Sequence, residues 1–262
     1  MSRTYDLLAR VYDTPDHLEI TAGFHAAVRP LVRARPRDTW VLDVACGTGV
    51  LAEKLARAGV PVLGVDGSRE MLAVARRRCR GLEGRVRFRR ADLASFRVRE
   101  PCSVATASGD VMNHMLSRAA LVRVLRRIRE SLLPGGVLVF EAHNRFCYEH
   151  YWNGHDYWME GAGGDLAMSC EWDAERRLAT ARMVGYAKVG RRRYEKVETT
   201  LVERYHRDGE LRAALRAAGW QRIEREPWSP WPDQHSEPAI DRNLWRARAP
   251  DAPARRRTRR RP

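Results

Sequence analysis

Residues 42–49, LDVACGTG, decide the fold of this chain. Together with Trp40 and Val41 they begin as a short apolar run, which predicts a buried strand, and they end in a turn that contains Gly47 and Gly49. A helical pattern follows and stops at Gly59. Because glycine lets a ligand come close to the backbone of a turn, the stretch predicts a strand, a ligand-binding loop and a helix.

The glycine turn alone leaves its ligand open. A turn that binds NAD has the pattern GxGxxG, and here Gly49 is followed by Val50, Leu51 and Ala52, so the third glycine is missing. Asp66 ends the next apolar run, where an acid can accept hydrogen bonds from both hydroxyls of a ribose. The pair of features favours a nucleotide-like ligand.

Short apolar runs and helical patterns continue to alternate up to residue 142. They predict strands at 60–65, 86–92, 104–108 and 137–140, and helices at 68–79 and from 117 to the Pro-Gly-Gly of 134–136. Strands that alternate with helices form a parallel sheet covered on both faces, and ligands bind beyond its carboxyl ends. Those ends are expected at Asp43, Asp66, Asp92, Ser108 and Glu141.

The pattern changes after residue 142. The segment 143–158 holds six aromatic residues, against 8% in the whole chain, which predicts a cover over something apolar or flat. Residues 168–206 predict two or three antiparallel strands. A helix at 209–218, a strand at 221–226 and a last edge strand at 243–247 are expected to follow, and a helix at 16–35 precedes the sheet.

These patterns divide the 262 residues into five predicted parts. They are N-terminal lid helices at 1–39, a cofactor-binding core at 40–142, an aromatic and antiparallel substrate cap at 143–206, the last helix and strands of the core at 207–250, and a disordered arginine-rich tail at 251–262. With 44% apolar and 31% charged residues, the chain can build a sizeable core.

The charge balance is strongly basic, at 48 lysines and arginines against 33 acids. Such a balance attracts phosphates, but six of the arginines lie in residues 251–262, which are typical of a solvated tail. Nucleic acid is therefore not the expected partner. The five cysteines form no CxxC pair, which argues against a zinc ribbon, a redox motif or a disulfide framework, and no metal site is predicted.

Targeting signals are not evident in the sequence. No apolar run approaches the roughly 20 residues of a membrane span, and the first residues, with Asp6 and Asp13, contain no apolar core of a signal peptide. We expect a cytoplasmic protein without a membrane partner.

Four motifs of the core resemble a known family. LDVACGTG, GVDGSREMLAVAR at 64–76, VRFRRADL at 86–93 and LLPGGVLVF at 132–140 are similar, in order and spacing, to the class I S-adenosylmethionine-dependent methyltransferases. The resemblance implies an α/β, Rossmann-like seven-stranded sheet of order 3-2-1-4-5-7-6, flanked by helices, whose last strand is antiparallel. An antiparallel β cap would be inserted after strand 5.

The resemblance also implies a cofactor, S-adenosyl-L-methionine, with S-adenosyl-L-homocysteine as its product. Asp66 would take the ribose hydroxyls, Met71 would pack beside the adenine, and Asp92 would face the adenine amino group. The loop from Ala45 would pass under the methionine part. The residues implied to bind the cofactor are Tyr12, Asp43, Ala45, Gly47, Gly49, Asp66, Met71, Asp92, Leu93 and Ser108.

Two further segments are similar to small-molecule N-methyltransferases of the glycine and amino-sugar types. The pairs Tyr5-Asp6 and Tyr12-Asp13 resemble a lid whose tyrosine closes over the cofactor, with Tyr12 the first choice for that role. The run GDVMNHML at 109–116 resembles a segment at the mouth of the site. Packed aromatics and a locally bonded histidine are the alternatives.

Two histidines are the catalytic candidates. His114 lies in GDVMNHML, and His143 follows the fifth strand, so either could bind the acceptor or take a proton. His150, His155 and Asp156 match no strong metal spacing.

Three functions compete. The first is methyl transfer to an amine or hydroxyl of a small molecule, in natural-product or secondary metabolism, by an enzyme that could form a homodimer. The second is an RNA or protein methyltransferase that uses the arginine surface. The third is a non-catalytic cofactor-binding subunit. An aromatic cap favours the first, because it suits a buried small acceptor and obstructs a polymer.

Overall fold

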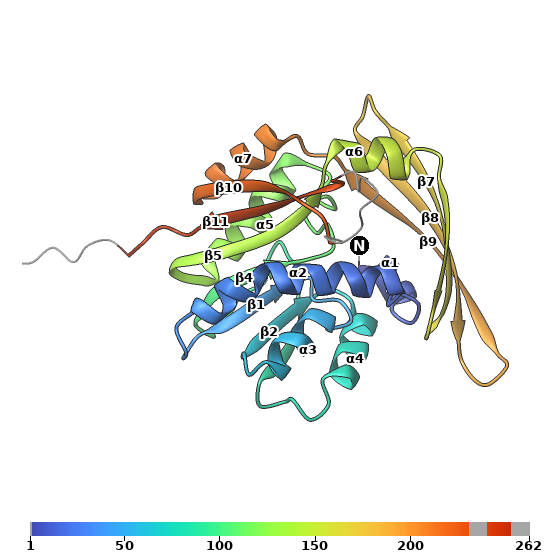
Figure 1. The fold of residues 1–262 in the computed structure, drawn as a ribbon, viewed down its shortest axis with the longest axis horizontal. Coiled ribbons are helices and arrows are strands. Elements are labelled where there is room, and N and C mark those ends of the chain that lie inside the picture. Colours follow the sequence, from blue (N-terminus) through green and yellow to red (C-terminus); the bar gives the residue numbers. More distant parts are fainter. Residues whose placement is uncertain (1, 231–239, 253–262) are drawn as a thin grey trace, which may run out of the picture.

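Two β-sheets organise the structure, a computed structural model that describes residues 2–230 and 240–252 (Figure 1). The strands of the larger sheet are, from edge to edge, β10 (Gln221–Trp228), β11 (Arg242–Arg248), β5 (Leu132–His143), β4 (Cys102–Ala107), β1 (Trp40–Val44), β2 (Val62–Asp66) and β3 (Val86–Arg90). The smaller sheet holds β6 (Asp156–Gly161), β7 (Gly164–Asp173), β8 (Leu178–Lys188) and β9 (Tyr194–Arg204). Within the described residues, no helix is long and apolar enough to cross a membrane.

The topology of the larger sheet confirms the predicted order 3-2-1-4-5-7-6. Strands β3, β2, β1, β4 and β5 run parallel, and β11 is antiparallel to β5. The smaller sheet follows β5 in the chain, where the cap was expected. The prediction of 243–247 as an edge strand is wrong, because β11 pairs with β5 on one side and with β10 on the other.

Helices cover both faces of the larger sheet. On one face, α2 (Pro15–Ala34) and α3 (Val50–Arg57) bury Phe24 and Leu55 against Val41 and its neighbours. On the other face, α5 (Arg118–Glu130) and α7 (Asp208–Ala217) do the same with Leu125 and Leu215. Each helix buries its apolar stripe because the strands between them are apolar on both sides.

The helix caps expected from the sequence are present. The Ser68 hydroxyl accepts from the Met71 N–H at 3.1 Å and begins α4 (Arg69–Arg78). The Ser117 hydroxyl accepts from the Ala120 N–H at 3.2 Å and begins α5. Each cap satisfies an N–H that a helix start leaves without a partner.

Strand β5 begins earlier than predicted. We expected Pro134, Gly135 and Gly136 to separate a helix from a strand that starts at 137, yet β5 begins at Leu132. The register against β4 shifts in this region, and Gly135 has a φ of 72°. The turn residues are accommodated as an irregularity inside the strand, which glycine permits.

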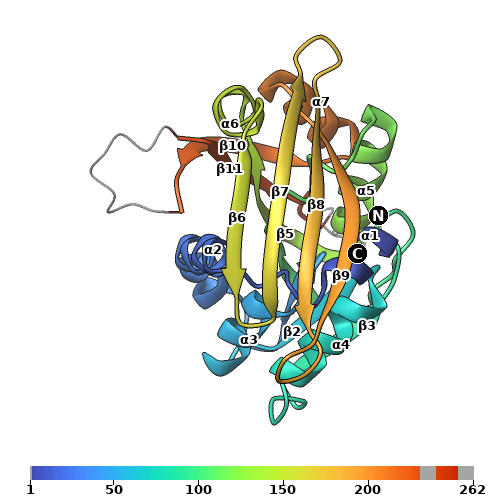
Figure 2. The ribbon, with the colours of Figure 1, turned by 90° about the vertical axis from the view of Figure 1, so that its right-hand side faces the viewer.

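The cap has four strands where two or three were predicted. Strand β6 lies in the aromatic stretch, in which Trp158 is exposed and the flanking Tyr157 and Met159 are half-buried. That alternation of two is the pattern of a strand with one covered face. Figure 2 shows the four strands of the cap side by side in front of the core. Between β5 and β6 the chain forms α6 (Arg145–Cys147) and the π-helix η1 (Tyr148–Trp152).

The N-terminal segment fills the space between core and cap (Figure 1). In and after α1 (Ser2–Leu8), Leu8 and Val11 are buried in one apolar cluster with Met71 of α4 and Leu201 of β9. The lid residues thus join the two sheets. The predicted tail lies outside the described residues from 253 onward.

The tight packing at Gly64 of β2 can be tested. A Cβ there would lie 2.7 Å from both the Cys46 sulfur and the Phe88 ring. We expect Gly64→Ala to destabilise the protein by about 1–3 kcal/mol in urea denaturation, because an overpacked core must shift. Gly84→Ala is the control, since a Cβ there has no neighbour among the described residues within 4 Å. Equal loss in both variants would contradict the packing argument.

Candidate functional site

Two adjoining cavities open where the N-terminal segment meets the core. The first has a volume of about 380 Å³ and lies at the carboxyl ends of the central strands. The second, of about 520 Å³, lies under the cap. Tyr5 and Tyr12 line both cavities, and their rings are 5.9 Å apart at 75°. The two tyrosines therefore stand at the junction.

The first cavity collects most of the residues predicted to bind the cofactor. It is lined by Tyr12, Ala45, Gly47, Asp66, Met71, Asp92, Leu93 and Ser108. Asp43 and Gly49 do not line it. Gly49 has a φ of 79° and begins α3, where a Cβ would lie 2.9 Å from the Ala75 side chain. Its place in the structure is a close contact between two helices.

The glycine turn holds Asp66 in position. The Gly47 N–H donates to Asp66 Oδ2 at 2.9 Å, and the Ser68 N–H donates to Oδ1 at 2.8 Å. Both Ala45, with a φ of 55°, and Gly47, with a φ of 51°, are left-handed, which turns the backbone N–H groups inward. Burial raises the pKa of Asp66, although these N–H groups oppose that shift.

Asp43 is buried beneath the same turn. Its Oδ1 accepts from the Thr106 hydroxyl at 2.9 Å, while Oδ2 has no hydrogen-bond partner in the described part of the chain. Burial raises its pKa to about 7. Because Asp43 does not line the first cavity, the fit to a cofactor depends on the residues that do. The acid Asp66 and the apolar Met71 suit a nucleoside-bearing molecule such as S-adenosylmethionine.

In each Tyr-Asp pair of the N-terminal segment, the tyrosine and the aspartate have different roles. Asp6 accepts from the Ser68 hydroxyl at 2.6 Å, and Asp13 accepts from the Thr48 hydroxyl at 2.6 Å. Arg78 of α4 adds an ion pair to Asp13. The aspartates fasten the segment to the core, so that the preceding tyrosines face the cavities.

The second cavity is apolar along the cap and acidic at its inner end. Its apolar lining comprises Leu8, Ile20, Tyr151, Trp152, Tyr157, Met159, Leu166, Met168, Met183 and Leu201. Its polar lining includes Asp16, His17, Asp110, His143, Glu203, Asp241 and Arg242. A cavity of this make-up binds an organic molecule by its body and orients it by a few polar groups.

A chain of polar contacts connects the two cavities. His114 Nε2 lies 2.9 Å from the Tyr5 hydroxyl and 3.3 Å from Asp110 Oδ1. Asp110 Oδ2 lies 3.6 Å from His143 Nδ1, which is 3.1 Å from Glu203 Oε2. The candidate catalytic histidines are therefore brought together through Asp110, with His114 on the first cavity and His143 on the second.

Burial and neighbouring charges shift the pKa values of these connected residues in opposite directions. Burial would raise the pKa of Asp110, but His143 and His114 outweigh it and lower the pKa. Burial would lower the pKa of His114, but the hydrogen bond to Asp110 and the charge of Glu203 raise it. Burial and Arg242 would lower the pKa of His143, but Cys147, followed by Asp110 and Glu203, raises it.

Glu141 holds the loop that carries Asp110. Its buried carboxylate accepts from the N–H of Gly109 and, at 3.0 Å, from the N–H of Asp110. Arg242 of β11 lies 3.3 Å from the same carboxylate. Asp110 has a φ of 49°, a left-handed conformation that a non-glycine residue rarely adopts. The ion pair thus fixes a strained turn at the centre of the site.

Sequence reasoning missed Asp110, Glu203 and Arg242. Asp110 is part of the motif GDVMNHML, in which the histidine is the more evident candidate. Glu203 lies on the inner face of β9 two residues after the buried Leu201, so strand alternation could have flagged it as a buried acid. Arg242 carries no local signal for its role in the site, because Glu141, which it balances there, lies 101 residues earlier in the chain.

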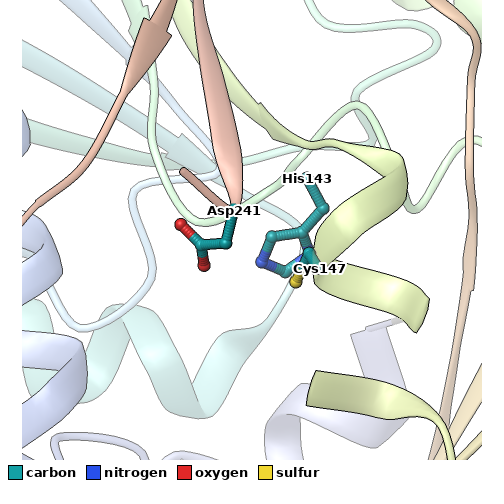
Figure 3. Close-up of side chains that lie close together, drawn as sticks. All are labelled: His143, Cys147 and Asp241. Carbon is teal, nitrogen blue, oxygen red and sulfur yellow. The ribbon is translucent and has the colours of Figure 1, made fainter. Parts of the chain in front are cut away.

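His143 also lies beside Cys147 and Asp241 (Figure 3). The potential ligand atoms of these three buried residues lie within 4.8 Å of one another, as do those of Asp110, His143 and Glu203. A ring nitrogen of His143 is turned toward the Asp241 carboxylate. Because His143 and Arg242 already supply positive charge here, we interpret the cluster as a network of charged hydrogen bonds.

Comparisons with known proteins identify a methyltransferase domain in part of the chain. Residues 41–136 match the model of a methyltransferase domain. A dTDP-4-amino-2,3,4,6-tetradeoxy-D-glucose N,N-dimethyltransferase of Saccharopolyspora spinosa is 35% identical over an alignment of 156 residues, which covers 54% of this chain and 61% of that protein. The chain spans about half the length of the curated relatives it matches.

Solved structures share the fold over almost the whole chain. An S-adenosylmethionine-dependent methyltransferase from Clostridium acetobutylicum, 18% identical, superposes with a TM-score of 0.73 over 95% of this chain and 97% of its own. The CcbJ methyltransferase from Streptomyces caelestis, 24% identical, gives 0.72 over 94% and 98%. The likeness covers both the core and the cap, and it confirms the fold predicted from the four motifs.

The buried Asp43 predicts a pH-dependent stability. Because burial raises its pKa from 3.8 to about 7, its proton stabilises the folded protein at low pH, and this contribution is lost as the pH rises through about 7. We expect Asp43→Asn to gain stability over the parent when urea denaturation at pH 8 is compared with pH 5. The amide oxygen can still accept from Thr106. If the free energies of unfolding of the variant and the parent differ by the same amount at pH 5 and pH 8, the raised pKa of Asp43 is contradicted.

Proposed function

We propose that this chain, which carries a class I methyltransferase domain, transfers a methyl group from S-adenosylmethionine to an amine or hydroxyl of a small molecule. The supporting observation is the pair of cavities that meet at Tyr5 and Tyr12. One holds the residues that fit the cofactor, and the other is closed over by the cap. A polymer would have to displace the cap, whereas a small acceptor fits beneath it.

The chain's own residues position the reaction. When bound, S-adenosylmethionine supplies a methyl group on a positively charged sulfur, which an in-line nucleophile displaces. Tyr5 and Tyr12 offer aromatic faces that suit a cation and keep water from the junction. Holding the acceptor and the methyl donor in line can lower the activation barrier by about 7–11 kcal/mol.

His114 is proposed to take the proton that the acceptor loses. Its Nε2 faces Asp110 and Tyr5, and its buried Nδ1 has no hydrogen-bond partner within the described residues. The carboxylate of Asp110 stabilises the imidazolium that forms, in the manner of an acid–histidine pair. His143 continues the chain of contacts to Glu203 and is proposed to hold Asp110.

The relatives favour a role in natural-product metabolism. The curated relative from Saccharopolyspora spinosa is named for methylation of an amino sugar, which supports a small-molecule acceptor with nitrogen as the attacking atom. A cytoplasmic location and a homodimer stay predictions.

The direct test is turnover. Purified protein, S-adenosylmethionine and a fraction of small molecules from a cell extract should give S-adenosylhomocysteine and an equal amount of a methylated product. Asp66→Ala should weaken cofactor binding by about 1.5–3 kcal/mol through loss of charge-assisted hydrogen bonds, with the exposed Asp38→Ala as control. Transfer of the label to RNA or protein alone would favour the second function, and binding without any product the third.

His114→Ala separates proton transfer from cofactor binding. We expect kcat to fall by roughly 10²–10⁴, the usual contribution of a general base, while calorimetry shows nearly unchanged affinity for S-adenosylhomocysteine. Because the pKa of His114 is raised, the acid limb of the parent's kcat–pH profile should lie above pH 6.5 and vanish in the variant. The exposed His150→Ala is the control. Unchanged kcat would remove His114 from the mechanism.

A further inference from the structure

Glu203 lines the second cavity and has a carboxylate oxygen without a hydrogen-bond partner in the described part of the chain. Its Oε2 is 3.1 Å from His143 Nδ1 and accepts from the Tyr148 hydroxyl at 2.8 Å. Its Oε1 is buried and has no hydrogen-bond partner among the residues the structure describes. The side chain is 1% exposed and lines the cavity. A buried carboxylate oxygen without a partner costs stability unless a donor fills the gap.

The charges around this oxygen determine whether the hydrogen-bond donor that reaches it should be a cation or an anion. Asp110 and Asp241 line the same cavity, and Asp16 lies at its rim. Arg242 is already engaged by Glu141 and by Asp241 at 3.3 Å each. A cation entering this end meets the carboxylates of Glu203, Asp110 and Asp241, whereas an anion meets their repulsion. The positive groups at this end, Arg242 and His143, are already paired with carboxylates.

The rest of the cavity is built for an apolar body. Three methionines, Met159, Met168 and Met183, line it on the cap side together with Leu166 and Leu201. Aromatic rings of Trp152 and its neighbours complete this wall. Methionine adapts to irregular shapes, and aromatic rings offer broad apolar area. The volume of about 520 Å³ holds a body of several rings.

From these observations we propose that the acceptor is an amine on a largely apolar, phosphate-free body, whose ammonium is received by Glu203 Oε1 and Asp110. The inference rests on the proposed function and narrows its substrate class. It separates this chain from the relative whose named substrate carries a dTDP group, because, among the described residues, Arg242 and His143 of the second cavity are already paired with carboxylates and are not free to bind a diphosphate.

The test uses three probes on the full chain saturated with S-adenosylhomocysteine. Tryptamine is an apolar body with an ammonium, indole-3-propionate is its anionic counterpart, and thymidine diphosphate represents a nucleotide-linked acceptor. We expect calorimetry to show saturable binding of tryptamine, at least tenfold tighter than that of indole-3-propionate, and no saturable binding of thymidine diphosphate.

Two variants locate the ammonium. Glu203→Gln and Asp110→Asn should each weaken tryptamine binding at least tenfold, and Asp110→Asn is the fallback if the buried Glu203 variant does not fold. Glu160→Gln, an exposed carboxylate on β6, is the matched control and should bind as the parent does.

Several results would overturn the inference. They are tighter binding of thymidine diphosphate than of tryptamine, absence of tryptamine binding, or unchanged binding in the folded Glu203 and Asp110 variants. Binding of S-adenosylhomocysteine is measured first. If S-adenosylhomocysteine does not bind, the proposed function itself is overturned. If it binds but the probes give one of the results above, only the proposed substrate class is overturned.

Discussion

The buried carboxylate of Glu141 is the contact on which the geometry of the site depends. It accepts from the N–H groups of Gly109 and Asp110, and Arg242 of β11 balances its charge. Without it, two left-handed residues would lose the partners that hold them there. The Asp110 carboxylate would then no longer lie between His114 and His143. The ion pair also explains why the antiparallel strand β11 matters to the site: it delivers the arginine.

A second constraint ties the binding of the donor to the shape of the acceptor cavity. Asp6 and Asp13 fasten the N-terminal segment to Ser68 and Thr48 of the core. The same segment presents Tyr5 and Tyr12 to both cavities and packs Leu8 against the cap. The position of the segment therefore helps to shape both cavities.

The sequence was informative where structure depends on neighbours in the chain. The glycine turn at 47–49 and the caps at Ser68 and Ser117 are local devices, and they were found from residue type and spacing. The contact of Asp110 with Glu203 through His143 joins a loop to the strands β5 and β9, which only folding brings together. Likewise, the pattern of 243–247 predicts an edge strand, because nothing in these residues indicates that β11 has a partner strand on each side. Local patterns give elements and turns, while burial of charge is set by the tertiary arrangement.

The acidic end of the second cavity creates a tension between binding and reactivity. Carboxylates that attract an ammonium also stabilise its charge, yet only a neutral amine can attack the methyl group. In the proposed mechanism His114 takes this proton next to the anchor, since His114 and Asp110 are 3.3 Å apart. A positively charged donor in the adjoining cavity adds repulsion that favours loss of the proton. Under this proposal, attraction on entry and deprotonation at the junction arise from charges in the two cavities that meet at Tyr5 and Tyr12, which gives each cavity its own part in a single transfer.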